Sequence, residues 1–370
     1  MSVTMQQMEL ILEKIAPVRF AEEWDNSGFN VNFHNREITG IMICLDVLPE
    51  IIEEAEKKGC NLLISHHPLL FRATKRIDSE RYEGKCIRML AERGISLYCA
   101  HTSMDSAPDG INTWLADQFH LTEREYIQDG VVEHFYEIAV HVPCEHADKV
   151  RRAMTAAGAG RLGEYEECTF NIYGEGTFRP NEYAHPYIGK TGEMETVKEV
   201  RISAICSESD TERVLRAVRA VHPYEVPAIS VLRTEEPKTL QSGLGIVGDL
   251  PQRLPVREVL DRLKKILQTD SVRVAGDIEK SVARIGICGG AAGDFAEAAR
   301  KKGAELFITG EIKHNEYAAR SEIILAEAGH FDTEKCFCRI YEQGLQKCLD
   351  DVNYNIAIYV TNLRRPYVNY

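Results

Sequence analysis

The sequence predicts an α/β protein with two related halves, each built on a mixed sheet, and a smaller α+β domain inserted between them. Three observations indicate this: a strand-helix-strand pattern near the N-terminus, a copy of it near the C-terminus, and a different strand-helix pattern in the middle. Strand-helix-strand units in series usually form a parallel sheet covered by helices. The binding and catalytic residues of such sheets gather at the carboxyl ends of the strands.

The first of these units lies before the adjacent histidines. Residues 38–47 form an apolar, β-branched run, 49-PEIIEEAEKKG-59 is amphipathic, and 61–65 is a second apolar run. A proline begins the predicted helix and a glycine ends it, which are the usual positions of these residues. The second strand therefore leads directly into His66.

The C-terminal part of the chain repeats this unit. The segment 283-ARIGICGGAAGDFAEAARKKGAELFITGEIKH-314 has the same order, and its 301-KKG-303 matches 57-KKG-59. In each half, the next apolar run is followed by a histidine with a carboxylate four residues later. These pairs are His101 with Asp105, and His330 with Glu334. We therefore expect a tandem duplication, with residues 1–128 as the first half and 241–370 as the second.

The middle of the chain, residues 129–240, has a different character. Strands are expected over 135–143 and 200–207, and a helical stretch follows each of them. Two strand-helix-strand units within roughly 110 residues are typical of a compact ferredoxin-like α+β domain. Polar segments flank this region, which suits a domain inserted in a connection of the larger one.

The composition of the 370 residues excludes several classes of protein. With 44% hydrophobic and 27% charged residues, the chain is typical of globular proteins, and its net charge of −13 disfavours an extended nucleic-acid interface. The N-terminus has neither a basic leader nor a long apolar core, so we expect no secretion, no membrane and a cytoplasmic location. Eleven cysteines, scattered from Cys44 to Cys348, indicate reduced thiols, and the Cys336 and Cys338 pair is a weak zinc signal.

The adjacent histidines His66 and His67 are the first candidate metal ligands. Neighbouring side chains of a regular strand face opposite ways, so both can serve one site only where the strand ends. Pro68 supports such an end, because proline cannot donate a hydrogen bond to a neighbouring strand. The alternative is that these histidines only pack or face solvent.

Other residues at expected strand ends complete a candidate set. It consists of His66, His67, Asp105, His330 and Glu334. Imidazole and carboxylate ligands together suit zinc, iron, manganese or nickel, and three histidines disfavour calcium. Five ligands exceed the need of one open catalytic ion, which predicts two ions sharing a carboxylate. Glu334 is the expected bridge, in the first turn of a helix over 334–349 capped by Asp332 or Thr333; the alternative is a plain capping carboxylate.

Weaker signals surround this set. The amides of 289-GGAAG-293 can hold a phosphate at the start of a helix over 294–303, unless Asp294 only caps that helix. His101 is a candidate base, or a residue that supports Asp105 without binding the metal. Three further assignments are less informative: Asp25 and Asn26 line the crevice or form a turn, His222 belongs to local structure of the insert, and 188-IGKTGE-193 lacks the first glycine of a phosphate loop.

Four motifs carry a resemblance to a known family. They are 24-WDNSGF-29, 64-ISHHPLLF-71, 100-AHTSMD-105 and 329-GHFDTE-334. Together they resemble the Nif-three-like family, often labelled GTP cyclohydrolase type 2 homologues, and 221-VHPYEVP-227 resembles the PII-like or CutA-like insert of its longer bacterial members. The resemblance implies a toroidal homohexamer in which each subunit holds two metal ions, with zinc the first expectation and iron or manganese possible. The ligands it implies are His66, His67, Asp105, His330 and Glu334.

Two functions are consistent with these features. The first is a metal-dependent hydrolase, whose two cations would activate water against a nucleotide-like or phosphorylated small molecule. The resemblance suggests the opening of a purine-type ring with loss of formate, and phosphoester hydrolysis would use the same centre. The second is a metal-binding regulatory or interaction protein without catalysis, whose PII-like insert senses a ligand or partner.

Overall fold

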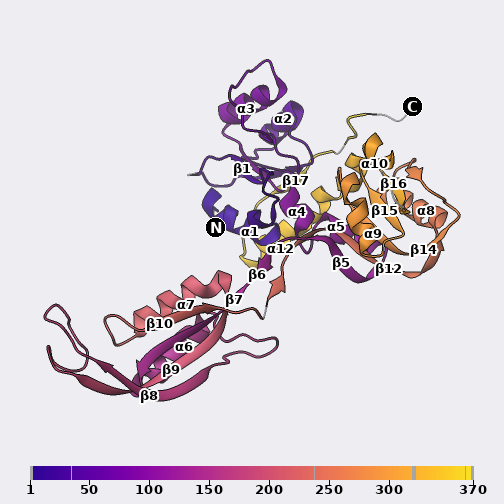
Figure 1. The fold of residues 1–370 in the computed structure, drawn as a ribbon. Helices are drawn as coiled ribbons and strands as arrows, with labels where there is room; N and C mark the ends of the chain where they lie inside the picture. Colours follow the sequence, from indigo (N-terminus) through magenta and orange to yellow (C-terminus); the bar gives the residue numbers. More distant parts are fainter. Residues whose placement is uncertain (1–2, 35, 237, 319–321, 363, 368–370) are drawn as a thin grey trace. The chain divides into compact units, whose positions relative to one another are not determined.

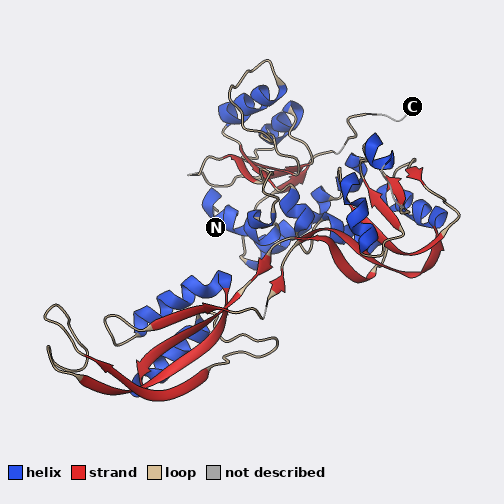
Figure 2. Cartoon of the chain, in the orientation of Figure 1, coloured by secondary structure: helices blue, strands red, loops and turns tan. Residues whose placement is uncertain are grey.

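The computed structural model describes residues 3–34, 36–236, 238–318, 322–362 and 364–367. The chain forms two compact units (Figures 1 and 2). One consists of Met1–Val131 together with Gln241–Tyr370, and the other is the insert, Val132–Leu240. Both duplicated halves therefore lie in the first unit.

The first half contains a five-stranded sheet in the order β1-β4-β3-β2-β17. Strands β2, β3 and β4 are parallel, β17 joins them in parallel, and β1 is antiparallel. All residues of β2, β3 and β4 are buried, as expected for strands covered on both faces. The elements are α1 (Met5–Ile15), η1 (Val18–Phe20), β1 (Gly28–Val31), β2 (Ile41–Cys44), α2 (Pro49–Lys57), β3 (Leu62–Ser65), α3 (Tyr82–Arg93), β4 (Ser96–Cys99), α4 (Thr102–Ser106), α5 (Ile111–Gln118) and β5 (Thr122–Asp129).

The second half contains a six-stranded sheet in the order β13-β16-β15-β14-β12-β5. Strands β14, β15 and β16 are parallel, and the other pairings are antiparallel. The elements are β12 (Gly243–Pro255), α8 (Val256–Leu267), β13 (Arg273–Ala275), β14 (Ser281–Cys288), η3 (Gly293–Phe295), α9 (Ala296–Lys301), β15 (Leu306–Thr309), α10 (His314–Ala318), β16 (Ile324–Glu327), α11 (His330–Glu334), α12 (Phe337–Asp351) and β17 (Ile358–Val360).

The two halves exchange their last strands. Strand β5 of the first half pairs with β12 in the second sheet, and β17 of the second half pairs with β2 in the first sheet (Figure 1). A single hydrophobic core then joins both sheets, with Met8 of α1, Ile64 of β3, Ile308 of β15 and Tyr341 of α12 all buried within it. This exchange holds the two sets of strand ends within one packed body.

The insert is a four-stranded antiparallel sheet in the order β10-β7-β9-β8. One face of the sheet packs against two helices, where Val140 and Val200 meet Met154 and Val218. The elements are β6 (Val132–Glu133), β7 (Phe135–Pro143), η2 (Cys144–His146), α6 (Ala147–Ala156), β8 (Phe170–Phe178), β9 (Glu195–Ser207), α7 (Glu208–Val221), β10 (Ile229–Arg233) and β11 (Thr239–Leu240). The predicted fold class, duplicated α/β halves with a ferredoxin-like α+β insert, is confirmed.

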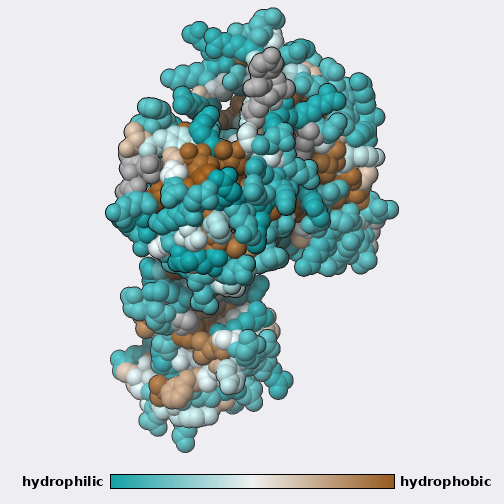
Figure 3. All heavy atoms as spheres, turned by 90° about the vertical axis from the view of Figure 1, so that its right-hand side faces the viewer, coloured by the Kyte–Doolittle hydropathy of each residue, from teal (hydrophilic) through white to brown (hydrophobic). Residues whose placement is uncertain are grey.

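One face of the molecule can be compared by hydropathy. The face drawn in Figure 3 is mostly hydrophilic, with apolar residues gathered in limited patches. Within the described ranges, no helix is both long enough and apolar enough to span a bilayer.

Candidate metal centre

The adjacent histidines directly follow β3, where the sequence places them. Their amides still donate to β2 and the residue after it, His66 to the Cys44 carbonyl at 3.3 Å and His67 to the Leu45 carbonyl at 3.0 Å. The fully buried His66 donates from Nδ1 to the Ala100 carbonyl at 2.9 Å. A carbonyl only accepts, so Nδ1 carries a proton, and in the neutral imidazole Nε2 presents a lone pair.

This lone pair faces carboxylate oxygens and has no hydrogen-bond donor. His66 Nε2 lies 3.9 Å from Asp105 Oδ1 and 3.6 Å from Glu334 Oε1. Both His66 Nε2 and Asp105 Oδ1 are buried without a hydrogen-bond partner. Buried polar atoms are almost always paired, and a proton or cation must lie between acceptors that converge in this way. The donor set therefore fits a metal ion.

A second group of donors converges on the other oxygen of Glu334. His67 Nε2 lies 2.9 Å and His330 Nε2 3.1 Å from Glu334 Oε2. The opposite nitrogen of each ring is held by a carboxylate, His67 by Asp46 at 2.8 Å and His330 by Glu311 at 3.2 Å. Carboxylates in this position fix the orientation of metal-binding imidazoles and increase their basicity.

The helix that carries Glu334 differs from the expectation. Glu334 ends the short helix α11, and the long helix α12 begins only at Phe337, after Cys336 as its N-cap. Thr333 does not cap α12, because its hydroxyl hydrogen-bonds to the Gly329 and His330 carbonyls of its own turn. The expected first-turn position was wrong. Glu334 instead shares one face of α11 with His330, four residues earlier.

The glycine-rich segment after β14 makes room for Glu334. Gly290 has φ +68°, and a Cβ atom there would lie 2.4 Å from Glu334 Oε1. The amides of this segment are already used: Gly289 donates to Asn112 Oδ1 at 2.9 Å, Gly290 to Thr333 Oγ1 at 3.1 Å and Ala292 to Thr309 Oγ1 at 3.3 Å. The prediction that this segment binds phosphate is therefore wrong for these three amides. Asp294 lies within η3 and gives α9 no side-chain cap.

His101 has a different partner from the expected Asp105. Its Nδ1 donates to Asp25 Oδ1 at 2.7 Å, and Asp25 also accepts hydrogen bonds from Ser27 and Thr102. His66, His67 and His101 offer ligand atoms within 4.8 Å of one another, as do His67, His330 and Glu334. His101 thus belongs among the residues that could hold a metal. Asp25 orients it, whereas the Asn26 side chain donates to the Leu70 carbonyl at 2.6 Å.

The charges of this cluster are strongly coupled. Against the effect of burial, the charge of His66 and the hydrogen bond from His330 hold the pKa of Glu334 well below its usual value. Burial raises the pKa of Asp105, although the charge of His66 opposes this. Burial also opposes protonation of His67, but hydrogen bonds to Asp46 and Glu334 raise its pKa to about 10. Without metal, protons on the imidazoles balance the carboxylates, and a cation would replace them.

The cluster opens into a crevice of about 490 Å³. His67, His101, Asp105, His330 and Glu334 lie on its wall. The aromatic rings of Trp24 and Phe71, which are 59% and 45% exposed, also line it, with their centroids 5.9 Å apart. The role of these two rings is not predictable from the sequence motifs.

The sequence did not predict that three carboxylates support the imidazoles of the site. Asp25, Asp46 and Glu311 hold His101, His67 and His330 respectively. Asp46 and Glu311 each lie two residues beyond the end of a strand, β2 and β15 respectively.

A protein-family model covers nearly the whole chain. The family model described as Duf34/NIF3 (NGG1p interacting factor 3) matches residues 3–366 of the chain. The chain belongs to the Duf34/NIF3 family. This confirms the Nif-three-like resemblance of the four sequence motifs.

Curated relatives in this family carry a common name. The chain is 41% identical over 306 residues, 82% of each sequence, to the GTP cyclohydrolase 1 type 2 homolog of Listeria monocytogenes. It is 33% identical over 364 residues, 97% of this chain and 96% of the relative, to the Bacillus subtilis protein of the same name.

A solved NIF3 structure has the same fold over the whole chain. A Bacillus cereus protein related to NIF3 matches with a TM-score of 0.90 and 30% identity, covering 100% of this chain and 99% of that one. The Staphylococcus aureus protein SA1388, at 24% identity and a TM-score of 0.78, shares the fold.

Proposed function

We propose that this NIF3 protein is a metal-dependent hydrolase with two divalent ions bound by His66, His67, Asp105, His330 and Glu334. The main support is the pair of buried, unpartnered acceptors, His66 Nε2 and Asp105 Oδ1, beside Glu334. One Glu334 oxygen faces His66 and the other faces His67 and His330, which suits a carboxylate shared between two ions.

Zinc is the ion that we propose first. Three imidazoles with two carboxylates match the nitrogen and oxygen ligands that zinc prefers in catalytic sites. Iron and manganese accept the same ligands, so cellular availability contributes to the choice.

The bound ions would lower the pKa of a water molecule and stabilise negative charge on the substrate. The residues of the chain have the remaining roles. Asp46 and Glu311 orient His67 and His330, and Asp25 holds the Nδ1 proton of His101. We assign to His101 Nε2, on the crevice wall, the transfer of a proton to or from the substrate.

The lining of the crevice suits a planar, nucleotide-like substrate. Trp24 and Phe71 expose aromatic faces beside the metal ligands, and such faces stack on heterocyclic bases. Leu244 and Phe295 add apolar surface to the same crevice. The name of the relatives, GTP cyclohydrolase 1 type 2 homolog, agrees with hydrolytic opening of such a ring. Phosphoester hydrolysis at the same centre is the variant reaction to be tested beside it.

The alternative is a metal-binding regulatory or interaction protein without catalysis. The family description, NGG1p interacting factor 3, and the separate cavity of the insert favour this candidate. We further propose a homohexamer, as the family resemblance implies, and a cytoplasmic location, which suits the eleven cysteines found free of disulfides. Native mass spectrometry would test the hexamer, and fractionation of cells would test the location.

The function is tested by metal analysis combined with turnover. GTP and a panel of phosphoesters are incubated with the purified protein, with and without a chelator. Chelator-sensitive turnover that is lost in Glu334→Gln, and kept in Glu80→Gln at an exposed position, supports the hydrolase. Full metal occupancy without turnover of any compound would favour the regulatory candidate.

A further inference from the structure

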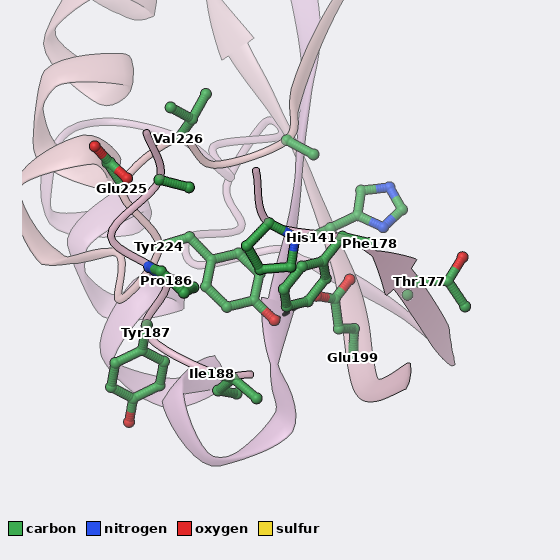
Figure 4. A pocket seen from close by; sticks show the side chains of 14 residues that line it. His141, Thr177, Phe178, Pro186, Tyr187, Ile188, Glu199, Tyr224, Glu225 and Val226 are labelled. Atoms are coloured by element: carbon green, nitrogen blue, oxygen red, sulfur yellow. Dashed lines mark hydrogen bonds between the residues drawn. The ribbon is translucent and has the colours of Figure 1, made fainter. Parts of the chain in front are cut away.

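The insert has a cavity of its own, on the sheet face opposite its two helices. Val140 and Val200 face the helices, so the alternating His141 and Glu199 face the other way, into a cavity of about 370 Å³. Gly176 of β8 adds to its floor. Two loops, 179–194 and 222–228, supply the remaining wall (Figure 4). This volume is enough for a small molecule.

The polar centre of the cavity is a buried carboxylate. Glu199 is only 8% exposed, and its Oε1 accepts a hydrogen bond from the Tyr224 hydroxyl at 2.7 Å. Within the described part of the chain, no lysine, arginine or histidine forms an ion pair with Glu199, and no lysine or arginine lines the cavity. Buried carboxylates are rare unless they are paired. Apart from the His141 imidazole, the lining therefore offers no group that can carry a positive charge.

The second oxygen of this carboxylate remains open to the cavity. A Cβ atom at Gly176 would lie 2.5 Å from Glu199 Oε2 and 2.7 Å from its Cδ. The carboxylate therefore fills the space above Gly176, where any side chain would collide with it. Only Oε1 has a hydrogen-bond partner among the described residues, and Glu199 lines the cavity, so Oε2 can contact a ligand there.

Aromatic rings form the wall beside Glu199. The centroids of Phe178 and Tyr224 lie 5.9 Å apart with an interplanar angle of 62°. Figure 4 shows both rings next to Glu199, with the Tyr224 hydroxyl turned toward the carboxylate. The faces of such rings attract cations, and their carbon atoms bury apolar groups. Ile188 and Val226 extend the apolar lining.

The loop that carries Tyr224 is held in place before any ligand binds. His222 Nδ1 accepts a hydrogen bond from the Tyr224 amide at 3.0 Å, so His222 Nε2 carries the ring proton and donates to the His141 carbonyl at 2.9 Å. The His141 amide in turn donates to the Ala228 carbonyl at 3.1 Å. These bonds fix both ends of the loop on β7, which reduces the entropic cost of binding.

We propose that this cavity binds a small organic cation, an ammonium group with an apolar body, whose charge contacts Glu199 Oε2 and whose carbon atoms contact Phe178 and Tyr224. A phosphate or carboxylate ligand would meet the charge of Glu199 without a compensating cation. A divalent metal ion needs several converging donors, and the described residues of the insert contain no such group of three. The proposal is independent of the hydrolase activity.

The test is calorimetric titration of the full-length, metal-loaded protein with matched pairs of compounds. Choline is compared with 3,3-dimethylbutan-1-ol, and butylammonium with butan-1-ol, because each pair differs mainly in charge. At least one cation is expected to bind about tenfold more tightly than its neutral partner. Equal affinities within both pairs, or no binding of either cation, would overturn the proposal.

Variants of the cavity separate its charge from its shape. Glu199→Gln keeps an acceptor for Tyr224 and is expected to abolish the preference for the cation, whereas Glu212→Gln, at an exposed carboxylate of α7 outside the cavity, is expected to keep it. A preference that persists in Glu199→Gln would overturn the proposal.

If Glu199→Gln does not fold, a second variant tests the proposed contact between the cation and Phe178. Phe178→Leu is expected to weaken cation binding about threefold and the neutral partner less, because only the ring attracts the charge. An equal loss for both compounds would contradict the proposed contact. Circular dichroism confirms that the insert remains folded in each variant.

Discussion

The two duplicated halves present similar strand ends with different side chains. In the first half, β3 is followed by His66 and His67, and in the second, β15 is followed by Gly310 and Glu311. His67 faces Glu334, whereas Glu311 supports His330 at 3.2 Å. The duplication thus supplies equivalent backbone positions, and the residue at each position decides whether it is a candidate ligand or a support.

After its strands, the second half has glycines at positions where the first half has larger side chains. A Cβ atom at Gly310 would lie 2.5 Å from Thr333 Oγ1 and 2.8 Å from the His330 Cα atom. Gly290 likewise takes the position that Asp46 has after β2. These glycines let α11 lie against the strand ends, so that Glu334 reaches the histidines of the other half.

The largest expected effect is the loss of metal when a proposed ligand, rather than a residue that supports a ligand, is replaced. His67→Ala is expected to remove at least one metal equivalent per chain, because it deletes an imidazole that faces Glu334. Glu311→Ala, at the equivalent position, is expected to keep the stoichiometry and weaken binding by about tenfold. Elemental analysis after dialysis against graded metal concentrations measures both. Unchanged stoichiometry in a folded His67→Ala protein would count against the proposed ligand set.

The next effect tests the space provided by glycine. Gly290→Ala and Gly59→Ala both place alanine at positive φ, +68° and +71°, and each should cost about 1–2 kcal/mol of folding free energy. Only Gly290→Ala introduces an atom beside Glu334, since a Cβ atom at Gly59 meets nothing within 4 Å. We expect metal loss in Gly290→Ala alone. Thermal unfolding and metal analysis together distinguish this result from a general loss of stability, which would affect both variants alike.

A smaller effect concerns the support of His67. Asp46→Asn keeps a hydrogen-bond acceptor beside His67 Nδ1 but removes its charge. Metal affinity should fall by about tenfold or less, as for other residues that orient a ligand. Competition with a chromogenic chelator measures this change, and an affinity equal to that of the unmodified protein would show that Asp46 has no such role.

The smallest effect is the dependence on pH. In the metal-free protein the raised pKa of His67, about 10, stabilises the fold below pH 6.5, and this contribution is lost as the pH rises through 10. A metal ion competes with the same proton, so its affinity should increase with pH between 6 and 8 and binding should release protons. Titration calorimetry in buffers of different ionisation enthalpy measures the release. Zero release would contradict the involvement of His67.

Much of the fold follows from patterns along the sequence. The repeated strand-helix-strand order and the 57-KKG-59 and 301-KKG-303 match reveal the duplication, because apolar period and helix punctuation are local properties. The exchange of β5 and β17 is not predictable in the same way. Strand pairing between distant segments depends on tertiary packing, which no local pattern encodes.

The candidate site was predictable only in part. His66 and His67 could be placed because adjacent histidines require a strand end. The pairing of Asp25 with His101 and of Glu311 with His330 could not be predicted, since spacing does not show which carboxylate faces which ring. The position of Glu334 was misjudged because the five-residue α11 is too short for periodicity to separate it from α12.

The most direct test of the central claim is anomalous diffraction from crystals grown without added metal, recorded at the zinc, iron and manganese edges. Two peaks are expected, one on each side of the Glu334 carboxylate, near His66 with Asp105 and near His67 with His330. Fully formed density for these side chains with no anomalous peak between them, or a peak elsewhere in the chain, would contradict that claim.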